Sequence, residues 1–284
     1  MTDYREILTE EADGVLTVTL NRPDRLNAWT GTMQAEVEEA ITRAGQSDQV
    51  RCIVVTGAGR GFCAGVDMQG LTAIQPGSPA AAAATSGSQA NGAAKGASTG
   101  NDKSLSALYP GRFGYLYDCP KPVIAAINGA CAGIGLVFTL YADFRFAAET
   151  AKFTTAFAQR GLIAEHGIAW LLPRLVGEAN ALDLLLTARK FTGAEAGQLG
   201  LVNRALPEGE LMAHVGDLAR HFVTQVSPRS VAVMKRQIRQ SYAQSFAASL
   251  AEADREMEAS FGSFDFKEGV ASFMERRPPA FQGA

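Results

Sequence analysis

The pattern of hydrophobic and polar positions near the start of the chain predicts elements in the order β-β-α-β. Residues 7–9 and 15–20 are rich in β-branched side chains and flank a turn at Asp13-Gly14, which indicates a hairpin. Thr30 is a suitable N-cap for a helix whose apolar side chains recur at helical spacing: Met33, Val37, Ile41 and Ala44. Residues 51–56 are again apolar and β-branched, so we expect a further strand there.

The later part of the chain predicts the same mixture of strands and helices, and then helices alone. Up to Leu206 the expected elements are helix-like spacing over 105–117, a buried strand at 121–127, a helix over 134–141, a short strand pair at 144–147 and 151–154, and helices over 168–175 and 180–187. Beyond Leu206 the spacing is helical over 208–225, 228–261 and 266–276. Too few strand signals occur there to extend a sheet, so we expect a helical cap or an oligomerisation arm.

The composition shifts sharply over residues 71–101, where Ala, Gly, Ser and Thr dominate and bulky apolar side chains are few. Such a segment has little with which to anchor a core, so we expect a surface insertion. The predicted division is therefore a core of residues 1–206, interrupted at 71–101, and a helical oligomerisation region of residues 207–284.

The overall composition favours one soluble globular enzyme. The chain has 284 residues, 47% of them hydrophobic, and a net charge of −3, so it is neither disordered nor basic enough for nucleic-acid binding. No secretion-signal pattern opens the sequence and no apolar run reaches about 18 residues, so we expect a cytoplasmic protein without a membrane partner. Cys52, Cys63, Cys119 and Cys131 lack metal-ligand spacing, so we expect reduced structural thiols and no metal site.

Two glycine-rich turns carry the clearest chemical signal. Residues 61–67 and 128–135 each follow a β-branched strand and leave backbone N–H groups free to face one anion. We expect Ala64 in the first turn and Ile134 in the second to supply the donors. Two such donors about 3 Å from one oxygen stabilise an enolate or a tetrahedral oxyanion, as in an oxyanion hole.

Other interpretations of these turns remain open at this point. Residues 57–61 are also compatible with a surface turn or with a dinucleotide-binding loop, although the latter requires a helix directly after the glycines. In the second turn, a glycine pair can simply allow close packing of a helix against a strand.

Four longer motifs occur in the chain at a characteristic spacing: Asn21-Arg22-Pro23-Asp24-Arg25-Leu26-Asn27-Ala28, Gly61-Phe62-Cys63-Ala64-Gly65-Val66-Asp67-Met68, Lys121-Pro122-Val123-Ile124-Ala125-Ala126-Ile127-Asn128-Gly129 and Ala142-Asp143-Phe144-Arg145. Shorter ones follow at Leu175-Val176-Gly177, Leu199-Gly200-Leu201-Val202, Ser227-Pro228-Arg229 and Phe266-Lys267-Glu268-Gly269-Val270. Together they resemble the crotonase (enoyl-CoA hydratase/isomerase) superfamily, in the family's order. The resemblance covers essentially the whole chain except residues 71–101.

The resemblance implies an α/β fold, a crotonase-like spiral of ββα units whose C-terminal helices build a trimer or, from two stacked trimers, a hexamer. It also implies a coenzyme A thioester as substrate, no separate cofactor, and a place in fatty-acid or related acyl-CoA metabolism. The thioester oxygen would accept from the Ala64 and Ile134 N–H groups. The implied CoA-binding residues are Arg25, Leu26, Ala28, Asp67, Met68, Phe273 and Arg276, the last two acting in their own subunit or a neighbouring one. Arg25 and Arg276 are also compatible with ordinary solvated charges.

The chain departs from the family where its hydratases carry two glutamates, because the matching positions hold Val137 and Phe157. Hydration needs a base to activate water and an acid for the α-carbon, and neither side chain can serve. Glu165 is the replacement candidate, since it lies between apolar stretches and aligns with a loop where other branches of the superfamily place an acidic residue. An apolar pocket would raise its pKa. The alternative is a helix-capping role for Glu165, and His166 beside it is interpreted as a capping or packing residue.

The sequence therefore predicts an enzyme of the enoyl-CoA hydratase/isomerase type that stabilises a thioester enolate, with Glu165 moving a proton. A single carboxylate suits isomerisation better than hydration. Two alternatives stay open: a non-catalytic acyl-CoA binding protein that has lost the hydratase carboxylates, and a CoA thioester hydrolase that uses Glu165 and His166. The insertion at 71–101 is expected to affect substrate access.

Overall fold

The computed structural model of the chain describes residues 3–67 and 104–284, which contain two sheets. One sheet consists of β1 (Ile7–Ala12), β2 (Val15–Leu20), β3 (Cys52–Gly57), β5 (Val123–Ile127), β7 (Phe144–Ala148) and β10 (Arg204–Leu206), in that order. The other consists of β4 (Gly61–Cys63), β6 (Ala130–Ala132), β8 (Lys152–Thr154) and β9 (Phe191–Thr192), in that order. The predicted insertion at 71–101 and the predicted CoA contact Met68 lie outside the described residues.

The strands pair mostly in parallel. β1 and β2 form the predicted antiparallel hairpin, with Ile7 opposite Leu20. From β2 onward the first sheet is parallel, and β3 and β5 are buried along their whole length, because central parallel strands are covered on both faces. In the second sheet β4 also pairs in parallel with β6, and β6 with β8. The carboxyl ends of β4 and β6 therefore meet at one edge.

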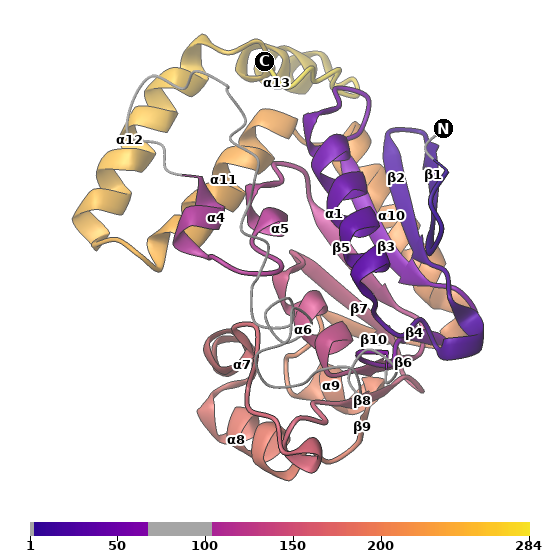
Figure 1. Cartoon of the computed structure of the whole chain (residues 1–284). Helices are drawn as coiled ribbons and strands as arrows, with labels where there is room; N and C mark the ends of the chain where they lie inside the picture. The colour runs from indigo at the N-terminus through magenta and orange to yellow at the C-terminus, as the bar shows by residue number, and fades with distance from the viewer. Residues whose placement is uncertain (1–2, 68–103) are drawn as a thin grey trace.

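Helices surround the sheets and extend beyond them (Figure 1). Those before Leu206 are η1 (Pro23–Arg25), α1 (Gly31–Gln46), α4 (Leu105–Leu108), α5 (Tyr115–Asp118), α6 (Ile134–Tyr141), η2 (Ala158–Arg160), α7 (Ile168–Val176), α8 (Glu178–Thr187) and α9 (Gly193–Gln198). After it come η3 (Glu208–Glu210), α10 (Leu211–Thr224), α11 (Pro228–Ser241), α12 (Phe246–Gly262) and α13 (Phe264–Glu275). Thr30 caps α1 as predicted, since its hydroxyl accepts from the Met33 N–H at 3.0 Å.

Three sequence-based expectations about elements were wrong in detail. The stretch 105–117 is not one helix, because Pro110 and the positive φ of Gly111 separate α4 from α5. The stretch 228–261 divides into α11 and α12, because the Ser245 side chain caps a new helix by accepting from the Ala248 N–H. The strands expected as a pair at 144–147 and 151–154 belong to different sheets.

The C-terminal arm, α11 to α13, is attached to the core through Asp143, which follows α6. Lys235 and Arg239 lie one turn apart on α11 and pair with the Asp143 carboxylate at 2.6 and 3.3 Å. The same carboxylate accepts from the Val123 N–H at 2.9 Å. These side chains are largely withdrawn from water, so removing one partner would leave a buried charge unpaired.

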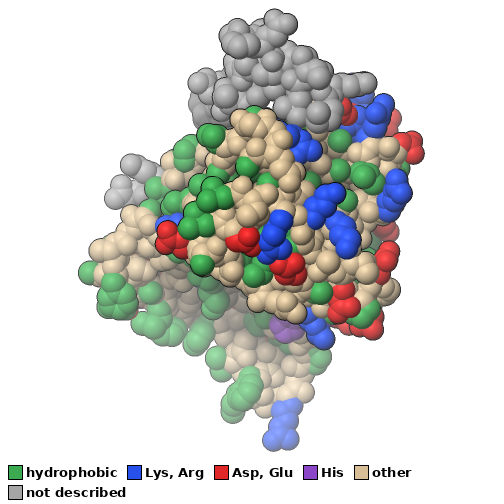
Figure 2. All heavy atoms as spheres, turned by 90° about the horizontal axis from the view of Figure 1, so that it is seen from below, with side chains coloured by type: hydrophobic (Ala, Val, Ile, Leu, Met, Phe, Trp, Pro, Cys, Tyr) green, Lys and Arg blue, Asp and Glu red, His purple; other side chains and the backbone are tan. Residues whose placement is uncertain are grey.

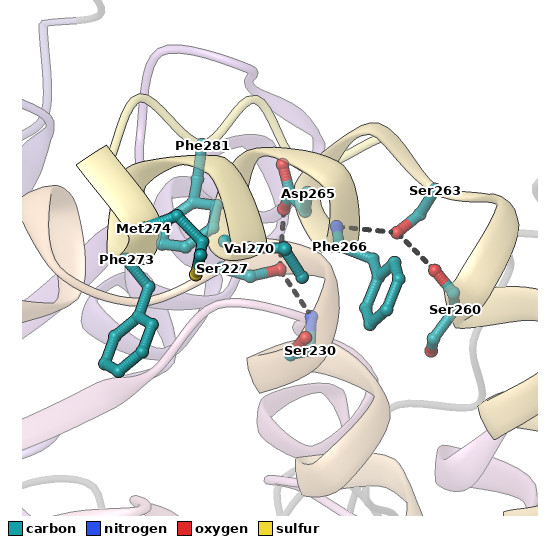
Figure 3. Close-up of a pocket in the computed structure, with 11 residues that line it drawn as sticks. Ser227, Ser230, Ser260, Ser263, Asp265, Phe266, Val270, Phe273, Met274 and Phe281 are labelled. Atoms are coloured by element: carbon teal, nitrogen blue, oxygen red, sulfur yellow. Dashed lines mark hydrogen bonds between the residues drawn. The ribbon is translucent and has the colours of Figure 1, made fainter. Parts of the chain in front are cut away.

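A second buried carboxylate, Asp265 at the start of α13, joins parts of the arm to one another (Figure 3). It accepts from the Ser227 hydroxyl at 2.6 Å and from the N–H groups of Gln282 and Gly283 at 2.8 and 3.1 Å. Ser227 in turn caps α11. Beyond this group, Phe273 projects from α13 and lines a cavity of about 460 Å³.

Charged side chains of both signs are interspersed on the face seen in Figure 2. Lys and Arg lie beside Asp and Glu there, so no field of a single sign builds up over that face. This distribution is consistent with the small net charge of −3.

Gly135 provides a test of how closely α6 packs on β4. A Cβ at this position would lie 2.6 Å from both the Cβ and the carbonyl oxygen of Cys63. Because the strand backbone cannot yield, Gly135→Ala should lower the free energy of unfolding by about 2–3 kcal/mol in urea titrations. Gly216→Ala, inside α10 with open space around the glycine, is the matched control and should raise stability by up to about 1 kcal/mol. Equal effects would contradict close packing at Gly135.

Candidate active site

The segment 22–29 lies along the first glycine turn and holds it in place. Asn27 is buried and has a left-handed φ of 55°, a conformation that asparagine tolerates. Its Nδ2 donates to the carbonyls of Ala58 and Gly61 at 3.0 and 2.7 Å, and its Oδ1 accepts from the Arg22 N–H at 2.8 Å. One side-chain amide therefore joins the two segments.

Trp29 sets the orientation of the backbone at Val66. The Trp29 N–H donates to the Gly65 carbonyl at 2.8 Å, and the Trp29 carbonyl accepts from the Asp67 N–H at 3.0 Å. These two bonds bracket Val66, so the Val66 N–H points away from Trp29. That N–H has no acceptor within residues 3–67 and 104–284.

Ala64 does not present a free donor, and this corrects the sequence-based expectation. Its N–H already donates to the Leu26 carbonyl at 3.0 Å. The turn itself occurs at Gly65, with φ of 109°, so the N–H groups released by the turn begin one residue later. The donor offered by the first turn is Val66.

The second glycine turn ends at the N-terminus of α6. Gly133, with φ of 49°, precedes the helix, and Ile134 is the first helical residue. The Gly133 N–H donates to the Thr154 carbonyl at 3.1 Å, which holds the turn against β8. The Ile134 N–H has no acceptor in the described part of the chain. Because a helix N-terminus favours negative charge, Ile134 is free to donate to an anion.

The two turns lie against each other because β4 and β6 are parallel neighbours. A Cβ built on Gly133 would lie 3.9 Å from the Gly65 Cα, and one built on Gly65 would lie 3.6 Å from the Ala132 carbonyl oxygen. The free N–H groups of Val66 and Ile134 therefore start from touching turns. This arrangement suits the binding of one oxyanion.

The elements next to the glycines decide between the alternative interpretations of these turns. A strand, β4, rather than a helix, begins at Gly61, so residues 57–61 do not form a dinucleotide-binding loop. Gly135 does allow close packing of a helix on a strand, as considered from the sequence. Close packing and a free donor at Ile134 thus occur in the same turn.

Glu165 lies in a loop shaped by two left-handed residues. His166 has φ of 52° and Gly167 has φ of 82°, and α7 begins directly after them. The Tyr141 hydroxyl, at the end of α6, donates to the His166 carbonyl at 2.9 Å. A Cβ at Gly167 would lie 2.7 Å from the same hydroxyl oxygen. Tyr141 thereby ties the Glu165 loop to the helix that begins at Ile134.

The Glu165 carboxylate is partly withdrawn from water, with 33% of its side chain exposed. Burial raises the pKa of Glu165, and the Arg112 guanidinium opposes this rise. Burial, assisted by Arg112, lowers the pKa of His166 to about 4, so His166 is neutral at pH 7. The 3.7 Å contact between Glu165 Oε2 and His166 Nε2 is then not an ion pair. A carboxylate with a raised pKa suits proton transfer.

The geometry does not support a helix-capping role for Glu165. The N-cap position of α7 is Gly167, and no side chain caps this helix. Glu165 contributes its backbone carbonyl alone, which accepts from the Ile168 N–H at 3.1 Å. His166 packs its ring edge-on against Phe113, with centroids 6.4 Å apart. The carboxylate of Glu165 is therefore not used by the helix.

Val137 and Phe157, at the positions matched to the hydratase glutamates, are both buried. Val137 lies three residues after Ile134 on α6, and Phe157 lies in the loop before η2. Beside Val137, Phe138 packs with Trp29 and Phe113 at centroid distances of 5.3 and 5.4 Å. Hydrocarbon side chains thus occupy both positions, and neither can exchange a proton.

The predicted CoA contacts near the first turn are placed together. Arg25 is exposed, and Leu26 and Ala28 follow it on the segment that lies against the turn. The Asp67 carboxylate pairs with the Arg22 guanidinium at 2.8 Å, so its side chain has a partner within the chain.

The other predicted CoA contacts lie elsewhere. Phe273 is an exposed residue of α13, and Arg276 follows the same helix in a left-handed conformation. In Figure 1, α13 lies at the top of the view and β4 lies well below it, on the right-hand side. A single chain therefore does not bring Phe273 and Arg276 to the segment that carries Arg25.

Three residues of this region were missed from the sequence: Val66, Arg112 and Tyr141. Val66 stands inside a recognised motif, and the usable signal was Gly65, the residue able to take a positive φ. Arg112 and Tyr141 reach Glu165 and its loop from distant segments. No local pattern predicts such contacts.

Other features of the site concern thiols, metals and membranes. Cys63 and Cys131 are buried free thiols beneath the two turns, and burial raises the pKa of Cys63 to about 12, which keeps it unreactive. Among the described residues, no group of three or more His, Cys, Asp or Glu side chains is placed to hold a metal ion. No helix in that part of the chain has the length and apolar character needed to cross a membrane.

The sheets, the glycine turns and the C-terminal helices define the class as a crotonase-like α/β protein. A family model described as enoyl-CoA hydratase/isomerase matches residues 10–92 and 77–284. The chain belongs to this family of acyl-CoA enzymes, as its motifs predicted.

Relatives and solved structures agree with this assignment over nearly the full length. The chain is 34% identical to 1,2-epoxyphenylacetyl-CoA isomerase of Escherichia coli, covering 98% of each protein. It is 35% identical to a probable enoyl-CoA hydratase of Rhodobacter capsulatus, covering 99% of each. The crystal structure of enoyl-CoA hydratase from Bacillus anthracis superimposes with a TM-score of 0.85 at 26% identity, covering 99% of this chain and 100% of that one.

His166 predicts a specific dependence of stability on pH. Its pKa is about 4 in the folded chain and about 6.5 when unfolded, so between these values the unfolded state binds more protons. The contribution of His166 to the free energy of unfolding is therefore complete above about pH 6.5 and is lost as the pH falls towards 4. His166→Asn keeps a residue that tolerates the left-handed backbone but cannot titrate. Urea unfolding at pH 7 and 5 should show a smaller loss for the variant than for the wild type, and identical losses would contradict burial of a neutral His166.

Proposed function

We propose that this chain isomerises an unsaturated acyl-CoA, using a backbone oxyanion hole and one carboxylate. The thioester oxygen would accept from the N–H groups of Val66 and Ile134. Glu165 would move the proton. The observation that supports this proposal most directly is the contact between the two glycine turns, each of which presents an N–H without an acceptor among the described residues.

One acid–base group, Glu165, is sufficient for this isomerisation, because the proton that it removes is the proton that it returns. The Glu165 carboxylate removes a proton from the α-carbon, and the electron pair of that C–H bond moves into the thioester to give a dienolate. The negative charge on the thioester oxygen is stabilised by the two backbone donors, each worth about 10²–10³ in rate. Protonated Glu165 then returns the proton to the γ-carbon, and the double bond moves into conjugation with the thioester.

Isomerisation fits this site better than hydration does. Hydration requires water to be activated and a second proton to be delivered, which the family's hydratases do with two glutamates. Here Val137 and Phe157 fill those positions. The similarity to a 1,2-epoxyphenylacetyl-CoA isomerase also favours a rearrangement within the acyl group, without naming the substrate of this chain.

Replacing Glu165 tests its proposed role. Glu165→Gln keeps the size of the side chain but can neither accept nor return a proton, so the turnover number for a 3-enoyl-CoA should fall by about 10²–10⁴-fold, with KM changed little. In the wild type, kcat/KM should fall as the pH drops through the raised pKa of Glu165, because a base must be deprotonated to act.

The matched control is Glu178→Gln, which changes an exposed glutamate at the start of α8. It should leave turnover unchanged. Full activity of Glu165→Gln would remove Glu165 from the mechanism. Absence of turnover by the wild type across unsaturated acyl-CoA thioesters would contradict isomerisation itself.

We further propose that CoA is held between subunits of a trimer or hexamer. Arg25, Leu26 and Ala28 would contact the nucleotide from one subunit, and Phe273 with Arg276 from its neighbour. The separation of these two groups within one chain supports this arrangement (Figure 1).

Mixing two variants with different defects separates this arrangement from one within a single chain. Phe273→Ala should raise KM, whereas Phe246→Ala should not; the two phenylalanines are 81% and 82% exposed. If Phe273 contributes to the site of a neighbouring subunit, a Phe273→Ala chain beside a Glu165→Gln chain keeps its own Glu165 and receives the neighbour's Phe273. Oligomers reassembled from the two variants then contain intact sites. Low-KM activity should then return on mixing, and failure to recover it in verified mixed oligomers would place Phe273 in its own subunit's site or outside any site.

A non-catalytic acyl-CoA binding protein is the second candidate function. The burial of Val137 and Phe157 at the positions of the hydratase glutamates is the observation that favours it. Calorimetry showing tight binding of an unsaturated acyl-CoA that is recovered unchanged after prolonged incubation would support binding alone. Formation of an isomer, or release of CoA thiol by hydrolysis, would eliminate it.

A further inference from the structure

We propose that the Arg22 guanidinium positions and polarises the Val66 N–H through a relay of two peptide groups. This inference rests on the proposed function, in which the Val66 N–H binds the thioester oxygen. Arg22 would touch neither the substrate nor the reacting atoms, so it is a positioning residue.

The relay is a chain of hydrogen bonds that all run in one direction. Arg22 Nη1 donates to the Ala28 carbonyl at 2.6 Å. The same peptide group ends in the Trp29 N–H, which donates to the Gly65 carbonyl at 2.8 Å. The Gly65 carbonyl belongs in turn to the peptide group that ends in the Val66 N–H. A cation therefore stands at one end of the relay and the free oxyanion donor at the other.

The relay acts first through geometry. A trans peptide group is planar, and its carbonyl and N–H point in opposite directions. Holding the Gly65 carbonyl on Trp29 therefore fixes the direction of the Val66 N–H. Gly65 itself has φ of 109° and no side chain to restrain it, so the restraint comes from the donors to its carbonyl: the Trp29 N–H at 2.8 Å and, more weakly, the Cys63 thiol at 3.8 Å.

The relay acts also through charge. Hydrogen bonds in a chain polarise one another by about 10–30% per bond, and bonds from a charged donor are stronger than neutral ones. The positive charge of Arg22 draws electron density along both peptide groups. The Val66 proton is left more positive and binds a developing oxyanion more strongly.

Two carboxylates keep Arg22 at the head of the relay. Arg22 Nη2 pairs with Asp67 Oδ2 at 2.8 Å, and Arg22 Nε lies 3.5 Å from Glu6 Oε1. With 21% of its side chain exposed, the guanidinium is partly shielded from water. Asp67 also donates its N–H to the Trp29 carbonyl. Asp67 therefore acts at both ends of the relay. Its carboxylate holds Arg22 at the start, and its N–H fixes the backbone directly after Val66.

This role for Asp67 differs from the CoA contact implied by the family resemblance, and the kinetic signatures differ too. Loss of a CoA contact raises KM and leaves kcat little changed. Loss of an oxyanion donor's position lowers kcat, because the interaction strengthens as charge develops. Arg22→Met should therefore lower kcat by about 10–100-fold with KM within about threefold of wild type.

The direct test is the infrared frequency of a bound thioester carbonyl. Butyryl-CoA labelled with ¹³C at the carbonyl carbon is saturated and has no double bond to move, so it reports polarisation in a stable complex. On the wild type its carbonyl band should move to lower frequency. Arg22→Met should lose much of that shift, and Arg22→Lys, which keeps the charge, should retain more of it than Arg22→Gln, which keeps a neutral donor.

Arg220→Met is the matched control, because Arg220 also pairs with an aspartate, Asp217, at 2.8 Å, but on the exposed surface of α10. It should bind the labelled probe with the wild-type frequency. Circular dichroism and calorimetric binding of the probe establish that each variant is folded and occupied. Should Arg22→Met fail to fold, the comparison of Arg22→Lys with Arg22→Gln carries the test.

The outcomes separate this inference from the proposed function. Equal carbonyl frequencies and equal kcat in wild type and Arg22→Met would overturn the relay, as would equal frequencies in Arg22→Lys and Arg22→Gln. A raised KM at constant kcat would assign Arg22 and Asp67 to CoA binding instead. If the wild type binds the probe without any shift, the oxyanion hole itself is absent and the proposed function falls with it.

Discussion

The close approach of two glycine turns is the constraint on which the site depends. β4 and β6 can pair only because their flanking turns carry no side chains at the points of contact. A Cβ at Gly129, just before β6, would fall on the Arg60 carbonyl oxygen, just before β4. The same absence of side chains frees the backbone at Val66 and Ile134. Packing and the proposed anion binding therefore impose the same requirement on the chain.

Helix α6 relates the two halves of the proposed chemistry. Its first residue, Ile134, offers a donor, and its last, Tyr141, holds the loop that carries Glu165. Ile134 and Tyr141 are the first and last of the eight residues of α6, so they lie about 10 Å apart along its axis. The donor at Ile134 and the loop that carries Glu165 are thus both attached to one rigid helix. The side chains between the two ends of this helix, such as Val137, are apolar and buried.

Much of the fold was predictable because it rests on local patterns. The hairpin, the capped helix α1 and the buried strands β3 and β5 follow from periodicity and from Thr30. The donor in the first turn was misplaced at Ala64, because a motif gives the turn but not which N–H the turn releases. That depends on the bonds made by Leu26 and Trp29, which belong to another segment.

The environment of Glu165 was also only partly predictable from the sequence. Its position between apolar stretches was visible in the sequence and correctly suggested a raised pKa. The neighbouring Arg112, which opposes that rise, comes from a segment more than fifty residues earlier and has no sequence signal of its own. Electrostatic neighbours of this kind arise from tertiary structure alone.

The attachment of the C-terminal arm at Asp143 gives α11 one permitted position along its axis. Lys235 and Arg239 share this carboxylate from consecutive turns. Sliding the helix by one turn would leave one cation buried with no counter-charge, an error costing several kcal/mol. The arm is therefore held in a single register against the core. The surface of α13 is therefore placed, relative to the core, by contacts that include this shared carboxylate.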